Sequence, residues 1–408
     1  MELVPFYQMM IKPPFPWKIR RVEVHPEIRR VDVWLEHGSG VFFACPECAE
    51  ALPVYDHTPE RSWRHLDTCD YETWLHAELP RVSCSKHGVR QAKPPLSDGR
   101  STLTFAMERR CIDTLAECSR KGAATLTGLS WDEMDTVMTR AVGRGMKRRP
   151  PGLPEWLGID EKSVFARHQY FTIITDLKAG LVHDVVDKRT IKAVEPWFQE
   201  RKAKLESVKK VAMDMSAGYA NVISSMVPQA EICYDHFHVT MKVNQAVDEV
   251  RKLEQRQMAE GDARCDFFRS RFLFLYNKEN IPEHRVAHFQ QLKEAAVQTG
   301  RAWAMKENFR EIWHCPTVET AAAFFKKWYW WATHSRLKPM RAAAHTIKNH
   351  WQGIANAITN KITNACTEGL NNKIEKIKRD AFGFRSKGKF RIAILFHCGG
   401  LDLYPSTA

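Results

Sequence analysis

The first ninety or so residues alternate between apolar and polar positions. The stretch VEVHPEIRRVDVWLEH alternates from Val22 onward, and LHAELPRVSC repeats the pattern from Leu75, with turn residues between the two stretches. A period of two is typical of strands that bury one face. We therefore expect a β-rich module over residues 1–95.

From about Leu103 the apolar period changes to that of helices, until the run RAVGRGMKRRPPGLP breaks it. Within this part, AATLTGLSWDEMDTVMTRAV resembles a helix-turn-helix, in which Ala124 to Gly128 form the end of one helix and the turn. Ser130 offers an N-cap for the next helix, and Glu133 completes a capping box. We predict a helix-turn-helix DNA-binding domain over residues 96–147. The alternative is a plain helical hairpin with a basic tail.

The middle of the chain combines strands and helices. LGIDEKSVFARHQYFTIITDLKAGLVHDVVDKRT contains three short apolar runs separated by turns, as in an antiparallel meander. VKKVAMDMSAGY and AEICYDHFHV indicate two more strands with a helical pattern between them. This is the α/β element order of an RNase H-like core, which we place at residues 155–243. Residues 244–355 indicate an all-helical insertion domain, and residues 356–408 the last part of the core with a basic C-terminal helix. The predicted fold class is multidomain α+β.

The charge balance favours a polyanionic partner. The 408 residues contain 61 Lys and Arg against 48 Asp and Glu, a formal net charge of +13 with a pI near 9.2, which points to nucleic acid. No apolar run approaches the roughly 18 residues that span a bilayer, and the N-terminus lacks the regions of a signal peptide. These features argue against a membrane protein and predict a cytoplasmic one. The eleven cysteines are then more plausible as metal ligands or small buried residues than as disulfides.

Two pairs of residues in the β-rich module have the spacing of zinc ligands. Cys45 and Cys48 lie in FFACPECAE, and Cys84 and His87 in RVSCSKHGV, each pair separated by two residues on a predicted turn. Four such ligands can form a tetrahedron around a structural Zn²⁺, which would stabilise a module with little core of its own. The separation between the pairs exceeds the usual ribbon spacing, so two unrelated turns remain the alternative. Other possible ligands are His57, His65 and Cys69.

Two carboxylates stand where an unused charge would be costly. Asp160 in WLGIDEKSV and Asp214 in VKKVAMDMSAGY lie in or at the end of predicted buried strands. Each alone is typical of a turn or a helix cap. With Glu368, at the head of TEGLNNKIEKIKRDAFGFR, they would supply three carboxylates for two divalent cations about 3.5–4 Å apart. Phosphodiester chemistry uses such a cluster because its transition state gains negative charge.

The segment after Glu368 is strongly basic. From Lys361 to Arg391 nine Lys or Arg accompany three Asp or Glu. On a helix, Glu368 would share a face with amides and cations at three- and four-residue steps, so that the carboxylate binds metal while its neighbours bind the DNA backbone. The alternative is that Glu368 is only an intrahelical ion-pair partner. The predicted DNA contacts are Arg140, Arg144, Lys147, Arg148, Arg149, Asn371, Asn372, Lys376, Arg379 and Arg385.

YDHFHV places Asp235 and His238 in a D-x-x-H spacing at the end of a predicted strand. These two residues would shape the catalytic pocket or contact DNA. The ordinary alternative is a strand-end turn with a hydrogen-bonded histidine. Asp235 is also the main rival of Asp160 and Asp214 as a metal ligand, and the sequence offers no geometry to choose among them.

The blocks GIDEKS, AMDMSAGY, YDHFHV and TEGLNNKIEKIKRDAFGFR, in this order, resemble bacterial insertion-sequence transposases of the ISL-three family. The resemblance covers most of the chain, from the cysteine pairs to about Phe396. It implies that Asp160, Asp214 and Glu368 form a DDE triad that holds Mg²⁺ or Mn²⁺ in an RNase H-like domain, behind zinc-finger and helix-turn-helix modules. The D-x-x-H spacing is similar to an element of Mutator-like transposases. The 154 residues from Asp214 to Glu368 fit a helical insertion within the core.

The family resemblance implies a DNA transposase that binds the terminal inverted repeats of an insertion sequence, cleaves strands and joins the resulting 3′-hydroxyl to target DNA. It further implies a homodimer or a larger synaptic complex on double-stranded DNA, associated with the bacterial nucleoid in the cytoplasm. An alternative is a non-catalytic zinc and helix-turn-helix DNA-binding regulator derived from a transposase, and a third is a nuclease that cuts without joining. A triad in RNase H order favours the enzyme, because a regulator has no use for it.

Overall fold

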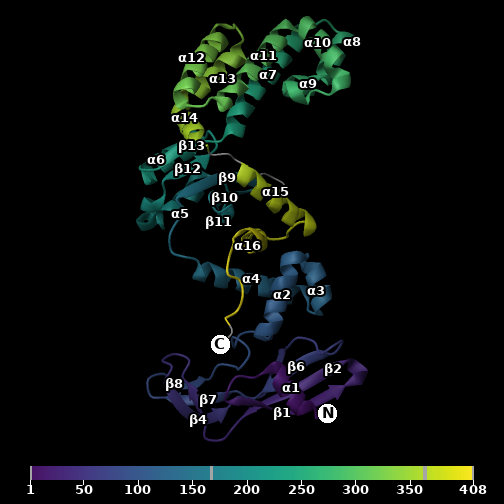
Figure 1. Ribbon diagram of the computed structural model, residues 1–408, viewed down its shortest axis with the longest axis vertical. Helices are drawn as coiled ribbons and strands as arrows, with labels where there is room; N and C mark the ends of the chain where they lie inside the picture. The colour runs from purple at the N-terminus through teal and green to yellow at the C-terminus, as the bar shows by residue number, and fades with distance from the viewer. Residues whose placement is uncertain (1, 166–168, 362–364, 407–408) are drawn as a thin grey trace. The chain divides into compact units, whose positions relative to one another are not determined.

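The structure, a computed structural model, describes residues 2–165, 169–361 and 365–406. The chain divides into two compact units, coloured along the chain in Figure 1. The first unit joins residues 1–149 to residues 378–408, and the second comprises residues 150–377. The C-terminal segment predicted to belong to the catalytic core therefore separates at residue 378, and its last helix groups with the N-terminal unit.

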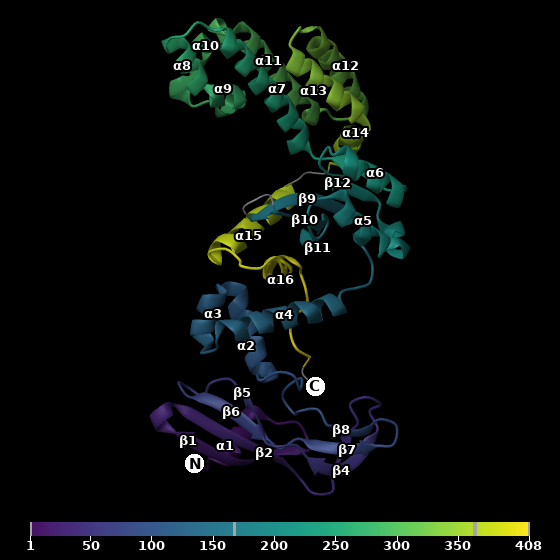
Figure 2. The ribbon, with the colours of Figure 1, turned by 180° about the vertical axis from the view of Figure 1, so that it is seen from behind.

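The N-terminal module is built from helix α1, Leu3–Ile11, and two four-stranded sheets. The sheets have the orders β1-β2-β6-β5 and β3-β4-β7-β8. Figure 2 shows the module with most of these strands labelled. In β2 the apolar positions of the sequence pattern, Val31, Val33 and Leu35, are buried. The β-rich character predicted for this part is confirmed. The strands are β1 Trp17–His25, β2 Arg30–His37, β3 Phe42–Ala44, β4 Ala51–His57, β5 Arg61–Arg64, β6 Glu72–Ala77, β7 Pro80–Cys84 and β8 Gly88–Gln91.

Helix α4 packs against three other helices of the first unit. Ser130 Oγ accepts a hydrogen bond from Glu133 N–H, and the Glu133 carboxylate accepts one from Ser130 N–H, so the predicted capping box is confirmed. Gly128, at φ 70°, forms the turn before α4 in the left-handed conformation that suits glycine. The four helices are α2 Phe105–Glu117, α3 Arg120–Thr127, α4 Trp131–Arg148 and α16 Lys387–Cys398.

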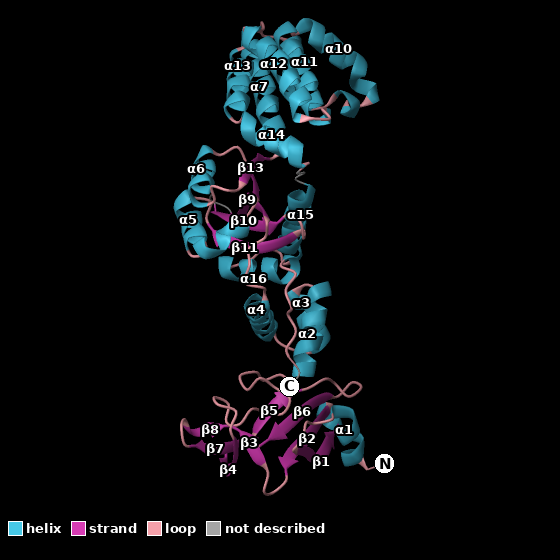
Figure 3. Ribbon diagram, turned by 60° about the vertical axis from the view of Figure 1, so that its left-hand side comes forward, coloured by secondary structure: helices cyan, strands magenta, loops and turns pink. Residues whose placement is uncertain are grey.

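The second unit contains a five-stranded sheet in the order β11-β10-β9-β12-β13. Strands β9 to β11 form an antiparallel meander, β12 runs parallel to β9, and β13 runs parallel to β12. This is the sequence of elements predicted from the apolar runs. Helices α5, Ile191–Gln199, and α6, Ala217–Met226, lie on one side of the sheet, and α15, Ala365–Asp380, lies on the other (Figure 3). The strands are β9 Trp156–Phe165, β10 Gln169–Asp176, β11 Leu181–Asp187, β12 Lys210–Met213 and β13 Glu231–Tyr234.

The segment between β13 and α15 is helical, and its described part, residues 236–361, contains no strand. Aromatic residues form its core: Phe309 and Trp328 are buried, and Trp328 Nε1 donates to the carbonyl oxygen of Met305 at 2.9 Å. None of the described helices of the chain combines the length and the apolar composition needed to cross a lipid bilayer. The helices of the segment are α7 His236–Gln257, α8 Asp262–Arg269, α9 Arg271–Leu275, α10 Val286–Ala295, α11 Val297–Arg310, α12 Val318–His334, α13 Lys338–Asn349 and α14 Trp351–Asn360.

Candidate active site and zinc site

Three aspartates lie at neighbouring positions where three adjacent strands of the second unit, β9, β12 and β13, pair in parallel. The residues immediately before Asp160, Asp214 and Asp235 are register partners across β9, β12 and β13. Residues that follow register partners on adjacent parallel strands lie next to one another. The three aspartates therefore occupy neighbouring positions. Asp235 N–H also donates to the carbonyl oxygen of Met213 at 3.1 Å, which extends the pairing by one residue. Sheet register therefore assembles carboxylates that are far apart in the sequence.

His238 lies among these carboxylates. Its Nε2 is 2.6 Å from Asp214 Oδ1 and 3.6 Å from Asp235 Oδ2, and ligand atoms of Asp160, Asp214 and His238 lie within 4.8 Å of one another. Burial alone would lower the pKa of His238, but the hydrogen bond to Asp214 and the nearby negative charges outweigh burial and raise it. Of the D-x-x-H pair, His238 thus belongs to the close group, and Asp235 lies beside it.

Asp235 has a second task in the fold. Its Oδ1 accepts the N–H of Phe237 at 3.1 Å and caps α7, and its side chain is only 6% exposed. Burial raises the pKa of Asp235 to about 6, and the charges of Asp214 and Asp160 act in the same direction. A buried helix cap is less accessible to a metal ion than the carboxylates of Asp160 and Asp214, which are only partly buried.

Helix α15 brings Glu368 to the same site. Asn371, three residues after Glu368, donates from Nδ2 to Asp160 Oδ2 at 2.6 Å. Glu375, seven residues after Glu368, has its Oε1 3.1 Å from Lys162 Nζ on β9. These two contacts hold one face of the helix to the sheet, at the helical spacing predicted from the sequence. The Glu368 side chain is exposed and lines an open cavity of about 1010 Å³ together with Asp160 and His238. It lies outside the close group of ligand atoms formed by Asp160, Asp214 and His238.

The remaining wall of the cavity is partly aromatic and was not predicted. Phe237, His236 and Trp313 line it, with the His236 and Trp313 rings perpendicular at 4.5 Å between centroids, and Lys361 adds a positive charge. His236 and Phe237 stand between Asp235 and His238 in the YDHFHV block, so the sequence already contained a signal for them. Trp313 comes from the helical segment, and no local pattern relates it to the carboxylates.

The donor atoms of the site fit a hard divalent cation. The carboxylate oxygens of Asp160, Asp214 and Glu368 are the ligand type that Mg²⁺ and Mn²⁺ prefer. The cavity beside them leaves space for a substrate, as a catalytic metal site requires. The imidazole of His238 is a softer ligand, and its short contact to Asp214 favours a role in holding that carboxylate.

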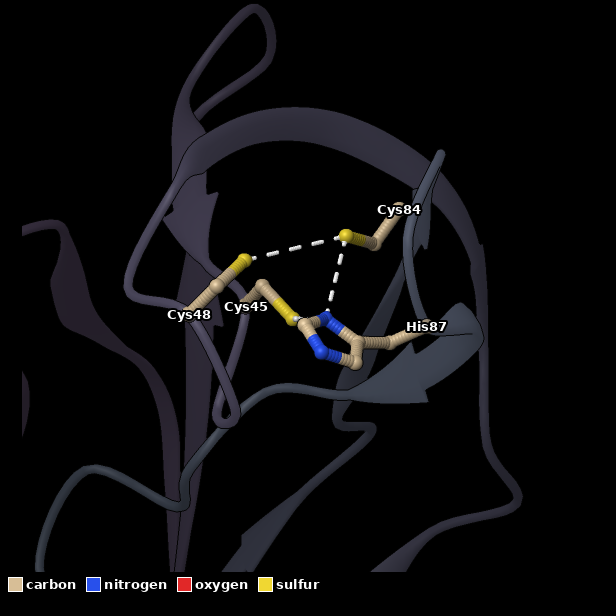
Figure 4. A group of neighbouring side chains, drawn as sticks. All are labelled: Cys45, Cys48, Cys84 and His87. Carbon is tan, nitrogen blue, oxygen red and sulfur yellow. Dashed lines mark hydrogen bonds between the residues drawn. The ribbon is translucent and has the colours of Figure 1, made fainter.

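In the first unit, Cys45, Cys48, Cys84 and His87 form a compact group (Figure 4). Cys48 Sγ is 3.7 Å from Cys84 Sγ, and His87 Nδ1 is 3.7 Å from Cys45 Sγ and 3.5 Å from Cys84 Sγ. Zinc–sulfur bonds of about 2.3 Å place the corners of a tetrahedron about 3.8 Å apart, so these four atoms have the separations of a closed zinc site.

The backbone prepares the first of these cysteines for metal binding. Cys45 N–H donates to the carbonyl oxygen of Glu50 at 2.8 Å, and Ala49 N–H donates to that of Cys45 at 2.9 Å, which closes a tight turn. Hydrogen bonds from the backbone, the largest from Cys48, lower the pKa of Cys45 to about 6 and favour its thiolate.

The three alternative ligands named from the sequence lie outside the zinc group. His57 Nε2 is 2.8 Å from His37 Nε2, His65 Nδ1 is 2.9 Å from Thr104 Oγ1, and the Cys69 side chain is exposed. Each of the two histidines therefore has a partner of its own. Among the residues that the structure describes, the close group consists of the four residues predicted first.

Several predicted DNA contacts have partners within the protein. Arg140 and Arg144 both pair with the buried carboxylate of Glu108, and Arg148 Nη1 lies 2.9 Å from Asp402 Oδ2. Arg149 donates to the carbonyl oxygen of Gly399, and Asn371 binds Asp160 as described above. These interactions give the residues a structural role, and their contacts to DNA stay predictions. The other predicted contacts have exposed side chains. They are Lys147, Asn372, Lys376, Arg379 and Arg385.

Comparison with known proteins finds matches for both parts of the chain that contain these sites. Residues 42–87, which include all four zinc-site residues, match the zinc-finger family of the transposases of IS204, IS1001, IS1096 and IS1165. The transposase for insertion sequence element IS1001 of Bordetella parapertussis is 25% identical over 370 residues, which cover 90% of this chain and 91% of that protein. The transposase for insertion sequence element IS1557 of Mycobacterium tuberculosis is 26% identical over 377 residues, covering 85% of this chain and 84% of that protein.

Among solved structures, the Drosophila P element transposase strand transfer complex matches with a TM-score of 0.40 and 9% identity, over 76% of this chain and 95% of that one. The match to a family profile is a firmer basis for assigning a family, because it spans more than half of the sequence. Residues 157–394, from β9 to α16, match the DDE transposase profile of ISL3 elements, whose description is "Transposase". The chain belongs to the ISL3 family of DDE transposases.

Proposed function

We propose that this transposase binds the terminal inverted repeats of its insertion sequence, cleaves a strand at each end and joins the 3′-hydroxyl to target DNA, with Asp160, Asp214 and Glu368 as its catalytic triad. One observation carries the proposal. Asp160 and Asp214 follow register-paired positions of parallel strands, and Glu368, on α15, lines a cavity together with Asp160. The strand order, a meander followed by two parallel strands, supports an RNase H-like core that the helices α7 to α14 would interrupt.

The three carboxylates would hold Mg²⁺ or Mn²⁺. When bound, such cations activate an attacking hydroxyl group and stabilise the charge that develops on the phosphate. Asn371 donates a hydrogen bond to Asp160, and His238 contacts Asp214, so each aspartate is held by a neighbouring side chain. Lys361, exposed on the wall of the cavity, is placed to balance the charge of a DNA phosphate.

DNA recognition falls to the first unit in this proposal. The zinc module and the capped pair α3 and α4 would contact the terminal repeats, with α4 as the recognition helix in the major groove. The net charge of +13 predicts binding that weakens steeply with salt, because bound cations are released from the DNA. Coordinated joining of two ends would require a homodimer or a larger synaptic complex.

The test is strand cleavage and strand transfer on a labelled duplex that carries the terminal repeat of the element, with Mg²⁺ or Mn²⁺. The wild type should cleave and join. Asp214→Asn should bind the duplex but lose at least about a thousandfold in rate, because it removes a charge that the metal site needs. Asp262→Asn, which changes an exposed carboxylate on α8, is the matched control and should retain activity.

Each other outcome has a defined meaning. Tight, repeat-specific binding without chemistry under either metal would support the regulator alternative and reduce the triad to structural carboxylates. Cleavage without joining would indicate the nuclease alternative. Full activity of Asp214→Asn would refute the assignment of this residue.

A further inference from the structure

Phe382 is an aromatic residue without a structural reason for its position. It follows the end of α15, its side chain is 100% exposed, and its backbone is left-handed at φ 50°. A residue with a side chain normally avoids this conformation, and an apolar one normally avoids full exposure. Both features cost stability in the free protein.

The conformation of Phe382 is imposed by the way the helix ends. Phe382 N–H donates to the carbonyl oxygen of Arg379 at 2.9 Å, and Gly383 N–H donates to that of Lys378 at 3.0 Å. These two bonds are those of a Schellman motif, in which the left-handed position is usually a glycine. Here that position is occupied by Phe382, although a glycine is the next residue in the chain.

Packing on the other side of the loop fixes the direction of the chain after Phe382. The ring of Phe384 stacks on that of Phe390 of α16, with centroids 4.6 Å apart. The guanidinium of Arg120 lies 4.9 Å from the Phe384 ring and 5.4 Å from the ring of Trp131. Trp131 is the first residue of α4, so the loop is anchored beside the N-terminus of the proposed recognition helix.

The surroundings of Phe382 are positively charged. From Lys378 to Arg391 there are six Lys or Arg and one Asp. Arg379 and Arg385, on either side of the phenylalanine, are exposed and have no ion pair with any residue in the described ranges. A free apolar ring between free cations matches duplex DNA, which offers phosphates for the cations and base steps for the ring.

We propose that Phe382 is a wedge that inserts between base pairs of the DNA bound by the first unit, while Arg379 and Arg385 contact the flanking phosphates. Insertion of an apolar side chain unstacks a base step and bends the duplex. The inference rests on the proposed function in one respect, namely that the first unit binds DNA. It does not depend on the triad or on catalysis.

The experiment uses the full-length protein and duplexes of the terminal repeat that carry 2-aminopurine at successive positions. Wild-type binding should raise 2-aminopurine fluorescence at one step, because an unstacked base is less quenched. Phe382→Gly should abolish this rise and weaken binding about tenfold, whereas Phe382→Trp should retain both. The matched control, Phe268→Ala, removes an equally apolar exposed ring from α8 of the second unit and should change neither.

Two further readouts separate insertion from a general loss of binding or of folding. Phe382→Gly should leave the slope of log Kd against log salt unchanged, while Arg385→Gln should reduce it by about one phosphate contact. Phe382→Gly should also raise the thermal midpoint of the first unit by about 2 °C, because glycine removes the left-handed strain. A variant that is more stable but binds DNA more weakly would indicate that Phe382 serves DNA binding and not folding.

The contrary results are distinct. If the wild type binds no terminal-repeat or target duplex, the proposed DNA recognition fails and the wedge fails with it. If the wild type binds and Phe382→Gly matches it in affinity and fluorescence, the wedge alone is wrong. If Phe382→Gly instead dissociates a dimer in sedimentation without DNA, a second copy of the chain covers the ring, and the inference is overturned.

Discussion

The zinc site and the carboxylate site are assembled in opposite ways. The four zinc-site residues come from two turns within residues 45–87, and their ligand atoms form one close group. The carboxylates come from β9, the residue after β12, and α15, over residues 160–368. Asp160 and Asp214 lie in a close group with His238, and Glu368 lines a cavity together with Asp160. A structural metal uses all of its coordination positions for protein ligands, whereas a catalytic metal needs space for a substrate.

The comparison teaches which interactions determine each site. The first depends on local backbone: the hydrogen bonds around Cys45 fix the turn and favour its thiolate. The second depends on long-range structure, namely the register of parallel strands and the two contacts that hold α15 to β9. Loss of one zinc ligand should therefore unfold the whole zinc module. Loss of one contact at the carboxylate site should reduce activity without unfolding the second unit.

Loss of a zinc ligand should have the largest effect. Structural zinc contributes on the order of 10 kcal/mol in small domains, so Cys84→Ser should release the metal and unfold residues 1–95. Residues 150–377 form a separate compact unit and should stay protected. Zinc content and hydrogen exchange by mass spectrometry measure both results. Cys69→Ser, which changes an exposed cysteine of the same module, is the control. Retention of zinc by Cys84→Ser would remove this residue from the ligand set.

Replacement of Glu368 tests whether the open site needs its third carboxylate. Glu368→Gln should lower the rate of strand cleavage at least about a thousandfold, because a neutral amide does not balance the charge of two cations. Asp235→Asn should cost about ten- to a hundredfold, since Asp235 caps α7 and contacts His238 without belonging to the close group. Cleavage and DNA affinity are measured in parallel. The reverse order of the two effects would make Asp235 the third ligand.

The difference between the two sites also explains what the sequence predicted well. The two-residue spacing within each of two turns predicted Cys45, Cys48, Cys84 and His87, and the structure brings these four side chains together. Apolar runs were enough to predict the five strands and their order along the chain, because buried strands need continuous apolar sequence. The family resemblance predicts the triad as a set, and that assignment stays a prediction, but no periodicity shows that residue 160 lies beside residue 214.

What the sequence left open depends on contacts between distant segments. Arg144 was predicted as a DNA contact because its helix is basic, yet its guanidinium pairs with Glu108, 36 residues earlier. Trp313 lines the cavity beside Asp160 and Glu368, although its own segment shows only a helical pattern. Phe382 was overlooked because neither its exposure nor its backbone conformation can be inferred from composition. Such features require the fold.

The pH dependence of the β module measures what besides zinc stabilises it. Burial lowers the pKa of His65 to about 4, and His65 Nδ1 lies 2.9 Å from Thr104 Oγ1, at the start of α2. The unfolded chain binds the proton first, near pH 6.5, so the contribution of neutral His65 is complete above that pH and is lost as the pH falls toward 4. The loss amounts to about 3 kcal/mol.

The measurement compares the unfolding free energy of wild type and His65→Gln in urea, followed by hydrogen exchange of the amides of β5 and β6. Zinc release in acid affects both proteins alike and cancels in the difference. The advantage of the wild type over the variant should shrink from pH 7 to pH 4. A constant difference over this range would show that His65 does not titrate in the folded module as its surroundings require.

Replacement of Asn371 should have the smallest effect on cleavage of the changes considered. Its exposed neighbour Asn372 is a matched control, which separates metal binding from DNA contact. Asn371 Nδ2 donates to Asp160 Oδ2, so Asn371→Ala should loosen Asp160 and raise the Mg²⁺ concentration for half-maximal cleavage about tenfold, with DNA affinity unchanged. Asn372→Ala should leave the metal dependence as it is and weaken DNA binding slightly. If instead both variants lose DNA affinity and neither alters the metal dependence, both amides contact DNA as the sequence predicted, and α15 is held to β9 mainly through the pair of Lys162 and Glu375.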